Sequence, residues 1–411
     1  MLALPFGSSL RLRLIATLTL ALLADSLGQP VTYAPSVSPV MTPAGSATET
    51  IPGELQFESV PSPLPVAIDA LDFAATATAE FGDLIRLHGA SHFIGRVGVV
   101  MSSGARWADF PDRSPLGFVH PITLSLYAVD RSEGSPRAGE LLARVTENFV
   151  IPWRLENTPN GGPANRALLL TFDLAPLGLA LPSDVIYGVS FNTQHDGSAP
   201  IGRAGPYDLL GLGLTTAEVQ TGADVDPNGV YWRRSPAGVL ALQPTPGWAP
   251  FKPAVRFHDS VYGLLFETVV RLETLRSGDS RGTAAISLAA SLVANALDRD
   301  LWAGNAQPAP HLGGQVFALL AEAADELTRV AGVPDPLGAE IQNALEALAR
   351  TTAYMAETAV ADAVIFGGDA HAVLRAQNAA EIAAENKARA DIGGAVDDYG
   401  AAWQEAQDAL R

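Results

Sequence analysis

The spacing of apolar residues changes near Ser260, and this change divides the chain into two parts. Before it, short stretches such as Ile122–Val129 and Ala167–Leu174 alternate apolar and polar residues with the period of two that is typical of strands. Connections rich in proline and glycine separate them, as in "DFPDRSPLGFVHP" and "QPTPGWAPFKP". Short strands joined by turns, without helical periodicity, predict an antiparallel β-sandwich over residues 54–260, most simply a jelly-roll-like one, with a single proline-rich barrel as the alternative.

After Ser260 the apolar residues recur at helical spacing, three or four positions apart. The longest stripe ends at Gly367-Gly368, and a later helical segment is interrupted at Gly393-Gly394. This pattern predicts four or five helices joined by short loops, which is a helical bundle over residues 261–411. The fold class is therefore α+β, with the β-sandwich and the bundle as separate domains. The longest stripe comprises Ile341, Leu345, Leu348, Met355 and Ala359.

The first residues have the composition of a secretory signal peptide. Arg11 and Arg13 precede an apolar run, and Ser26 and Gly28 supply small residues at a cleavage-site spacing. The run is too short to span a bilayer, and no transmembrane segment is expected elsewhere. We predict a signal peptide over residues 1–28, followed by a disordered linker rich in proline, serine and threonine over residues 29–53. The protein is then expected to be secreted.

Composition excludes several kinds of chemistry. The chain has no cysteine, so disulfides, thiol nucleophiles and thiolate metal sites are absent. Its formal net charge is −18, which argues against nucleic acid as a partner because phosphate binding needs a basic surface. No HExxH zinc motif and no phosphate-binding glycine loop occurs in the sequence. The sequence leaves the oligomeric state open.

Two groups of motifs resemble known secreted proteins. The stretches "VIYGVSFNTQH", "GPYDLLGLGL" and "GWAPFKP" are similar to a recurring domain of secreted bacterial β-sandwich proteins whose function is uncharacterised. The stretch "ALDRDLWAGNAQPAPHLGGQVFALL" resembles a helical module appended to secreted bacterial and archaeal proteins. The resemblances imply the same two-domain architecture and an extracellular location, and they imply no catalytic residues.

The connection from Ser190 to Leu214 contains the first candidate site. Asn192, His195, Tyr207 and Asp208 could surround a pocket at one end of the sandwich, with His195 as a base that Asp208 orients. The alternative is structural: asparagine and aspartate side chains hold turns by bonding to backbone groups, and the tyrosine ring would be buried. The structural alternative is favoured.

The stretch "DVDPNG" contains the second candidate site. Asp224, Asp226 and Asn228 reproduce the opening of a calcium loop, in which alternate residues direct oxygens at one ion. The twelfth position, which should be a bidentate glutamate, is Ser235, so a site here would be open, weak or completed by another loop. A plain Asp-Pro-Asn-Gly turn explains the same residues, and calcium remains the one cofactor that the sequence suggests.

Tryptophan and tyrosine residues in the loops of the β part form the third candidate. Trp232 and Trp248 could stack on sugar rings, which would make the partner a glycan or a cell-surface component. The alternative is that they close the open ends of the sandwich.

The function expected from these patterns is that of a secreted, non-enzymatic surface or extracellular-matrix protein. The β-sandwich would present binding loops, and the helical bundle would act as a spacer or docking module. One alternative is a carbohydrate-binding module or a carbohydrate-active enzyme, which an exposed row of tryptophans or a suitably spaced pair of acids would favour. Another is a helical platform for a protein partner, which an apolar groove on the bundle would favour.

Overall fold

The structure is a computed structural model. It describes residues 31–33, 41–43, 55–89, 92–132, 134–156, 164–227, 229–234, 238–244, 251–275, 280–332 and 337–411. The predicted signal peptide, most of the predicted linker, Asn228 and Trp248 lie outside these residues. Within the predicted disordered linker, Val31–Tyr33 and Met41–Pro43 form short paired strands.

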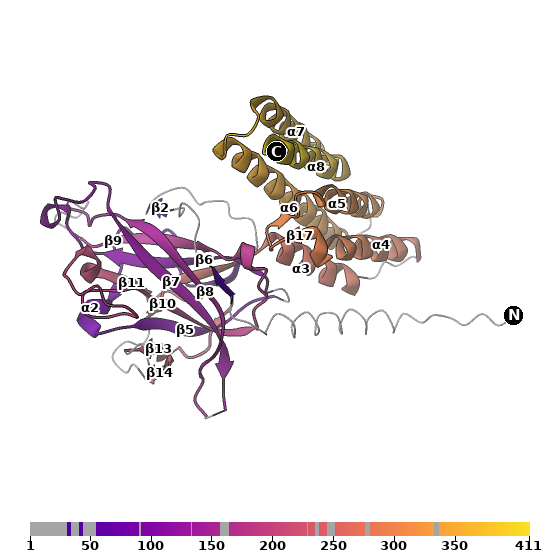
Figure 1. Cartoon of the computed structure of the whole chain (residues 1–411). Coiled ribbons are helices and arrows are strands. Elements are labelled where there is room, and N and C mark those ends of the chain that lie inside the picture. Colours follow the sequence, from indigo (N-terminus) through magenta and orange to yellow (C-terminus); the bar gives the residue numbers. More distant parts are fainter. Residues whose placement is uncertain are drawn as a thin grey trace.

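Two sheets, whose strands lie between residues 31 and 259, form the β-domain, and six longer helices form the helical domain, residues 261–411, within the described residues (Figure 1). The first sheet contains β1 (Val31–Tyr33), β5 (Glu80–Arg86), β7 (Phe118–Asp130), β8 (Arg137–Ile151), β10 (Asp184–Ser190), β12 (Ala223–Asp224), β13 (Gly229–Arg233) and β14 (Ala241–Pro244). The second sheet contains β2 (Met41–Pro43), β3 (Leu55–Glu58), β4 (Ala70–Asp72), β6 (Ile94–Ser103), β9 (Arg166–Asp173), β11 (Leu210–Thr215), β15 (Lys252–Pro253) and β16 (Val255–Asp259). Short helical turns are α2 (Phe73–Thr76), η1 (Trp107–Asp109), η2 (Ala175–Leu177) and η3 (Pro206–Leu209).

The main core of the β-domain lies between the two sheets, as the alternating pattern predicts. On β6, the side chains of Val97, Val99 and Met101 are wholly buried in this core, while Arg96 and Gly98 alternate with them on the opposite face. The strands pair antiparallel throughout the described part except β1 with β8. The chain also changes sheet repeatedly between β5 and β11, as it does in jelly rolls. The predicted antiparallel β-domain is confirmed.

The first sheet also closes on itself and encloses a second, smaller core. The pairing runs from β8 through β14, β13, β5, β10 and β7 back to β8. Inside this ring the wholly buried Glu80 carboxylate forms an ion pair with Arg233 and accepts a hydrogen bond of 2.9 Å from the Tyr127 hydroxyl. Burial raises the pKa of Glu80, and the Arg233 charge opposes that rise. The ring therefore contains a buried charge together with its partners.

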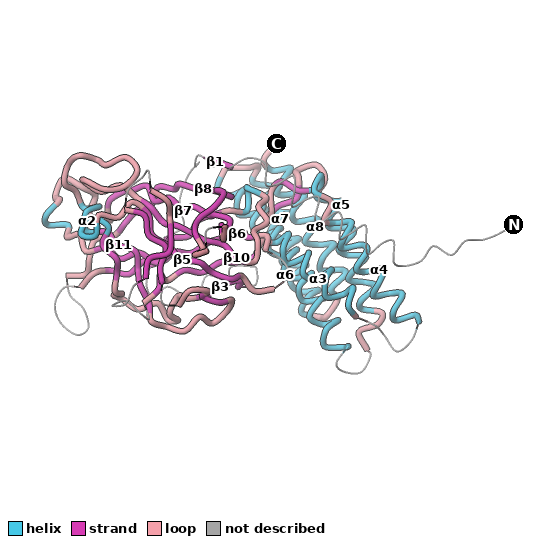
Figure 2. Tube along the Cα trace, turned by 90° about the horizontal axis from the view of Figure 1, so that it is seen from below, coloured by secondary structure: helices cyan, strands magenta, loops and turns pink. Residues whose placement is uncertain are grey.

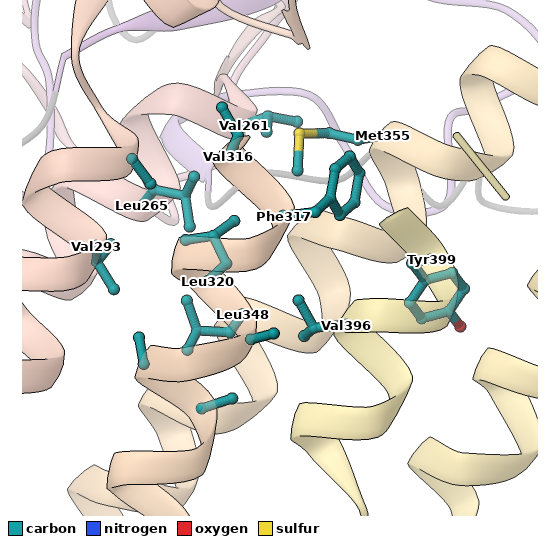
Figure 3. Close-up of a cluster of buried hydrophobic side chains, with 14 of the residues drawn as sticks. Val261, Leu265, Val293, Val316, Phe317, Leu320, Leu348, Met355, Val396 and Tyr399 are labelled. Atoms are coloured by element: carbon teal, nitrogen blue, oxygen red, sulfur yellow. The ribbon is translucent and has the colours of Figure 1, made fainter. Parts of the chain in front are cut away.

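The six helices pack around one apolar core, which confirms the predicted helical domain. Figure 3 shows side chains from several of these helices gathered between them, among them Leu265, Phe317, Leu348 and Val396. No helix in the described part of the chain combines the length and the apolar character needed to cross a membrane. The helices are α3 (Val261–Thr274), α4 (Ser280–Ala296), α5 (Gly313–Thr328), α6 (Leu337–Ile365), α7 (Ala370–Ala388) and α8 (Ile392–Ala409), with η4 (Arg299–Leu301) and the hairpin strands β17 (Trp302–Ala303) and β18 (Gln307–Pro308) between α4 and α5.

The break between the last two helices, α7 and α8, comes a few residues before the glycines at which the sequence pattern predicts it. The chain turns at Ala390, where φ is +64°, and Asp391 caps α8 by accepting a hydrogen bond from the Gly394 backbone N–H. Gly393 and Gly394 therefore lie within the first turn of α8 instead of between helices. The sequence pattern predicted four or five helices because the segment interrupted at Gly393-Gly394 counted as one, whereas it forms two helices, α7 and α8.

The two domains meet in a hydrogen-bonded joint, with the helices lying beside one end of the β-domain (Figure 2). Asn305 is wholly buried there: its backbone N–H and its side-chain amide donate to the carbonyls of Ala175 and Leu179, at 2.7 and 3.2 Å. Arg96 of β6 donates to the Tyr354 hydroxyl of α6 at 2.8 Å. The bundle is thus fixed against the β-domain by directional bonds as well as by the chain itself.

Candidate functional site

The loop after β10 is held by its own polar side chains. The two carboxylate oxygens of Asp208 accept hydrogen bonds from the backbone N–H groups of Gln194 and Gly205, at 2.7 and 2.8 Å. The Asn192 side chain accepts one from the Ala199 N–H at 2.9 Å. Three backbone donors that would otherwise need water or another partner are satisfied in this way. These contacts match the structural alternative proposed for this loop.

Tyr207 and His195 occupy opposite environments in the same loop. Tyr207 is buried and donates its hydroxyl to the Arg203 carbonyl at 2.7 Å, while His195 is exposed. No hydrogen bond joins His195 to Asp208 in the described structure, so the expected base and its orienting acid are not paired. Ligand binding by this loop stays a prediction.

Beneath the loop lies a histidine that the sequence did not single out. His120 of β7 is 3% exposed and stacks on the Tyr207 ring, with 5.3 Å between centroids and 22° between planes. Its Nε2 atom is buried without a hydrogen-bond partner. Burial lowers the pKa of His120 to about 4, against the opposing effect of Asp208. The ring is therefore neutral at pH 7 and serves as a packing surface for the loop.

Asp224, the first residue of the "DVDPNG" stretch, lies beside the C-terminal end of β5. Asp224 pairs with Ile85 in the strand register, and Asp226 accepts a hydrogen bond of 3.0 Å from the Tyr231 hydroxyl. Asp83 of β5 is 2% exposed, and burial together with the charges of Asp224 and Asp226 raises its pKa well above the ordinary range. Oδ1 of Asp224 is buried without a partner. Three carboxyl groups therefore influence one another here.

These carboxyl groups do not converge as a set of metal ligands. Within the described residues, no group of three or more histidine, aspartate or glutamate side chains is placed to hold a metal ion. The third predicted ligand, Asn228, lies outside the described residues. Calcium binding stays a prediction that the described geometry does not favour.

The aromatic side chains act mainly as packing residues. Trp232 is half-buried, donates its indole N–H to the Thr78 hydroxyl at 2.9 Å and packs edge-on against Phe81. Trp153 is 7% exposed and donates to the Ser114 carbonyl at 3.0 Å. Trp107 is 47% exposed, and the described residues provide no row of tryptophans beside it. Trp248, the other predicted sugar-binding residue, lies outside the described part.

The structure shows a different candidate in the helical domain, a groove of about 640 Å³ between α6 and α7. This α6–α7 groove has the volume of an ordinary binding pocket. Three of its side chains are strongly exposed: Val364 by 54%, Ile365 by 73% and Leu374 by 54%. The other lining residues are Glu357, Val360, Ala361, Gln377, Asn378, Ala380 and Glu381.

The turn between α6 and α7 is firmly built. Gly367 adopts a φ of +72°, a conformation that favours glycine, and the Gly368 N–H bonds back to the Ala363 carbonyl at 2.8 Å. Asp369 then caps α7 by accepting a hydrogen bond from the Ala372 N–H, while its own N–H donates to the Ala409 carbonyl of α8 at 2.9 Å. The two walls of the groove are therefore held at a fixed separation.

Helix α7 borders the groove with exposed side chains. The residues that α7 buries are all alanines, Ala372, Ala376 and Ala383. Their small side chains let the helix pack closely on its neighbours, and none of the three lines the groove. Leu374 lies off this alanine stripe and borders the groove instead.

The sequence contained a signal for this groove that the periodicity argument passed over. The core stripe of α6 continues from Ala359 to the wholly buried Ala363. Val360 and Val364 each follow a core position by one residue, so they form a second apolar stripe on an adjacent face. A helix with two apolar stripes has more apolar surface than one core contact uses.

Two further cavities occur in the described structure. One in the β-domain, of about 470 Å³, is lined by Asp69, Asn165, Thr215 and Phe251 among others. Another of about 260 Å³ lies between α3 and α6. Neither contains a residue that the sequence predicted for a site.

Comparison with known proteins identifies no relative of this chain. The chain matches no protein-family model, no curated protein and no solved structure.

Proposed function

We propose that this is a secreted, non-enzymatic binding protein whose helical domain docks an apolar segment of a partner in the α6–α7 groove. The observation that carries the proposal is the preformed apolar groove with Val364, Ile365 and Leu374 exposed on its walls. Contiguous exposed apolar surface is uncommon on proteins without partners and typically marks an interaction site.

The groove is suited to docking because its walls do not have to be ordered on binding. The glycine turn, the Asp369 cap and the bond from Asp369 to Ala409 hold α6 and α7 in place. A preorganised site loses less conformational entropy when the partner binds, so more of the contact energy appears as affinity.

The β-domain has the role of a rigid frame in this proposal. Asn305 and Arg96 bond across the joint, so the groove has a defined direction relative to the two sheets. The extracellular location is supported by the signal-peptide pattern of residues 1–28.

Glycan binding by the β-domain is a second candidate. Its cavity of about 470 Å³ combines hydrogen-bonding side chains, Asp69, Asn165 and Thr215, with the ring of Phe251. This combination suits a sugar, whose hydroxyl groups need polar partners and whose ring face is apolar. Asn165→Ala would weaken binding to immobilised glycans if this cavity were the site.

The docking proposal is tested with an uncharged amphipathic peptide that carries leucines at helical spacing and glutamines elsewhere. We expect fluorescence anisotropy to show binding to the full chain, and Val364→Asp with Leu374→Asp to abolish it. Leu288→Asp with Val239→Asp, which places the same two charges on exposed apolar residues of α4 and of the β-domain, is the matched control and should bind as the wild type does. Binding that survives the groove variant, or no binding at all, would overturn the proposal.

A further inference from the structure

We infer that the partner of the α6–α7 groove is an amphipathic helix of another polypeptide, with an apolar stripe and a positive charge near one end. The inference rests on the proposed docking function and adds the shape and charge of the occupant.

The spacing of the groove residues indicates the shape of the partner. On α6, the lining residues Glu357, Val360 or Ala361, and Val364 or Ile365 recur every three or four positions. From Glu357 to Ile365 they span nine residues, which is about 12 Å or just over two turns of helix. Side chains arranged in this way form ridges and grooves that accept a second helix with the same spacing. A helix also satisfies its own backbone groups, so it can cover an apolar surface without leaving donors unpaired.

The antiparallel arrangement of α6 and α7 makes the groove different at its two ends. Val364, Ile365 and Leu374 lie next to the turn that joins the helices, so this end is apolar. Glu357 and Glu381 lie two or more turns away from it on their respective helices, so they mark the other end. The groove therefore has an apolar end and an acidic end.

No positive charge on the groove compensates the acidic end. Its lining includes the two glutamates and no lysine or arginine. The nearest basic residues of α7 are engaged elsewhere: Arg375 bonds to Glu405 of α8 at 2.8 Å, and Lys387 to Glu346 of α6 at 2.9 Å. A partner with lysine or arginine at this end would supply the missing opposite charge.

The same charges argue against a second copy of this chain as the occupant. Residues 261–411 carry 21 acidic and 10 basic side chains, a net charge of −11. Two such domains meeting groove to groove would bring Glu357 and Glu381 of each copy toward a surface of the same sign. Like charges facing each other across an interface oppose association.

The experiment compares three peptides of identical leucine stripe, with two lysines, two glutamines or two aspartates at one end. Fluorescence anisotropy with the full chain at low salt should show the tightest binding for the lysine peptide, weaker binding for the glutamine peptide and the weakest for the aspartate peptide. Two exposed charge pairs correspond to about a tenfold gain for lysine over glutamine. Because the pairs are exposed, about 0.5 M salt should remove most of that gain.

Variants assign the charge effect to the groove. In the variant Glu357→Gln with Glu381→Gln, the lysine and glutamine peptides should bind with equal affinity. Glu322→Gln with Asp300→Asn removes the same charge from exposed positions on α5 and η4 and should leave the tenfold difference intact.

The outcomes separate this inference from the proposed function. Equal binding of the lysine and glutamine peptides, with both lost in Val364→Asp/Leu374→Asp, would keep the docking function and overturn the charged partner. The inference of a charged partner would also be overturned if the control variant Glu322→Gln/Asp300→Asn lost the preference for the lysine peptide as fully as the groove variant Glu357→Gln/Glu381→Gln does. Sedimentation showing a dimer that Ile365→Asp dissociates would make a second copy the occupant and contradict the inference. Failure of every peptide would overturn both proposals.

Discussion

Gly188 of β10 leaves the space that the Glu80 carboxylate of β5 occupies. A Cβ atom at position 188 would overlap the Glu80 side chain, and Glu80 is the ion-pair partner of Arg233. The two residues lie on paired strands, so the absence of one side chain permits the burial of the other. Position 188 therefore requires glycine because the Glu80 side chain approaches its backbone closely, and not because the chain turns there.

This relationship predicts non-additive mutations. Glu80→Ala should destabilise the protein by about 3–5 kcal/mol, because it leaves Arg233 without its buried partner. Gly188→Ala should cost about 1–3 kcal/mol in the wild type through overpacking. In the Glu80→Ala background the same glycine change should cost little, since the overlapping atoms are gone. Urea unfolding of the four proteins measures the coupling, and strictly additive values would contradict the contact.

Asp208 is expected to act as a loop tether. Asp208→Ala removes the acceptor of two backbone N–H groups and should lower the free energy of unfolding by about 1–3 kcal/mol. Hydrogen exchange should show faster exchange at Gln194 and Gly205, the two residues that lose their acceptor. His195→Ala, at an exposed position in the same loop, is the control and should change neither quantity. Unchanged exchange in Asp208→Ala would refute the tether.

His258 should make the protein less stable in mild acid. It is 7% exposed, neither ring nitrogen has a partner, and burial with the charges of Arg256 and Arg96 lowers its pKa from 6.5 to about 4. The neutral ring is favoured in the folded state, so stability is full above pH 6.5 and falls as the pH drops toward 4. The slope from one such proton is about 1.4 kcal/mol per pH unit.

The comparison with His258→Asn isolates this contribution from other titrating groups. We expect urea unfolding between pH 4 and 7.5 to give a shallower acid loss for the variant than for the wild type. Parallel profiles for His258→Asn and the wild type would show that this ring does not titrate as proposed.

Asp83→Asn should stabilise the protein at pH 7 in buffer without calcium. Burial, together with the charges of Asp224 and Asp226, raises the pKa of Asp83, so wild-type stability declines as the pH rises above 3.8. Asparagine cannot ionise and removes that decline. Thermal unfolding at pH 4 and pH 7 measures the effect, which should be confined to the higher pH.

Adding calcium to the wild type tests the predicted site of Asp224, Asp226 and Asn228. A cation bound there would raise the midpoint of thermal unfolding. Asp226→Ala should remove any calcium response. A midpoint that calcium does not change would leave the "DVDPNG" stretch as a turn.

Local periodicity was enough to predict the two domains. The stripe from Ile341 to Ala359 is buried in the helical core, and Val97, Val99 and Met101 face the core of the β-domain. Each of these patterns lies within one element, so it can be recognised without knowing what packs against it. The role of Asp208 in holding its loop was also one of the two interpretations that the sequence offered, because asparagine and aspartate have characteristic local roles in turns.

The groove and the buried ion pair depended on partners far away in the sequence. Glu80 and Arg233 are 153 positions apart, and only the pairing of β13 with β5 brings them together. The apolar residues Val360 and Val364 could have belonged to the core of the bundle. Whether another helix covers them depends on how the alanine face of α7 packs, and local periodicity does not determine this.

The passage from β16 to α3 also determines how the protein responds to mechanical load. Strand β16 ends at Asp259 and α3 begins at Val261, with Ser260 as the helix cap between them. β16 is paired with β3 on one side and β6 on the other. A pulling force on the helical domain along this strand would act on both ladders in shear, with many hydrogen bonds resisting at once. A partner held in the α6–α7 groove would therefore be tethered to the interior of a sheet and not to a flexible linker.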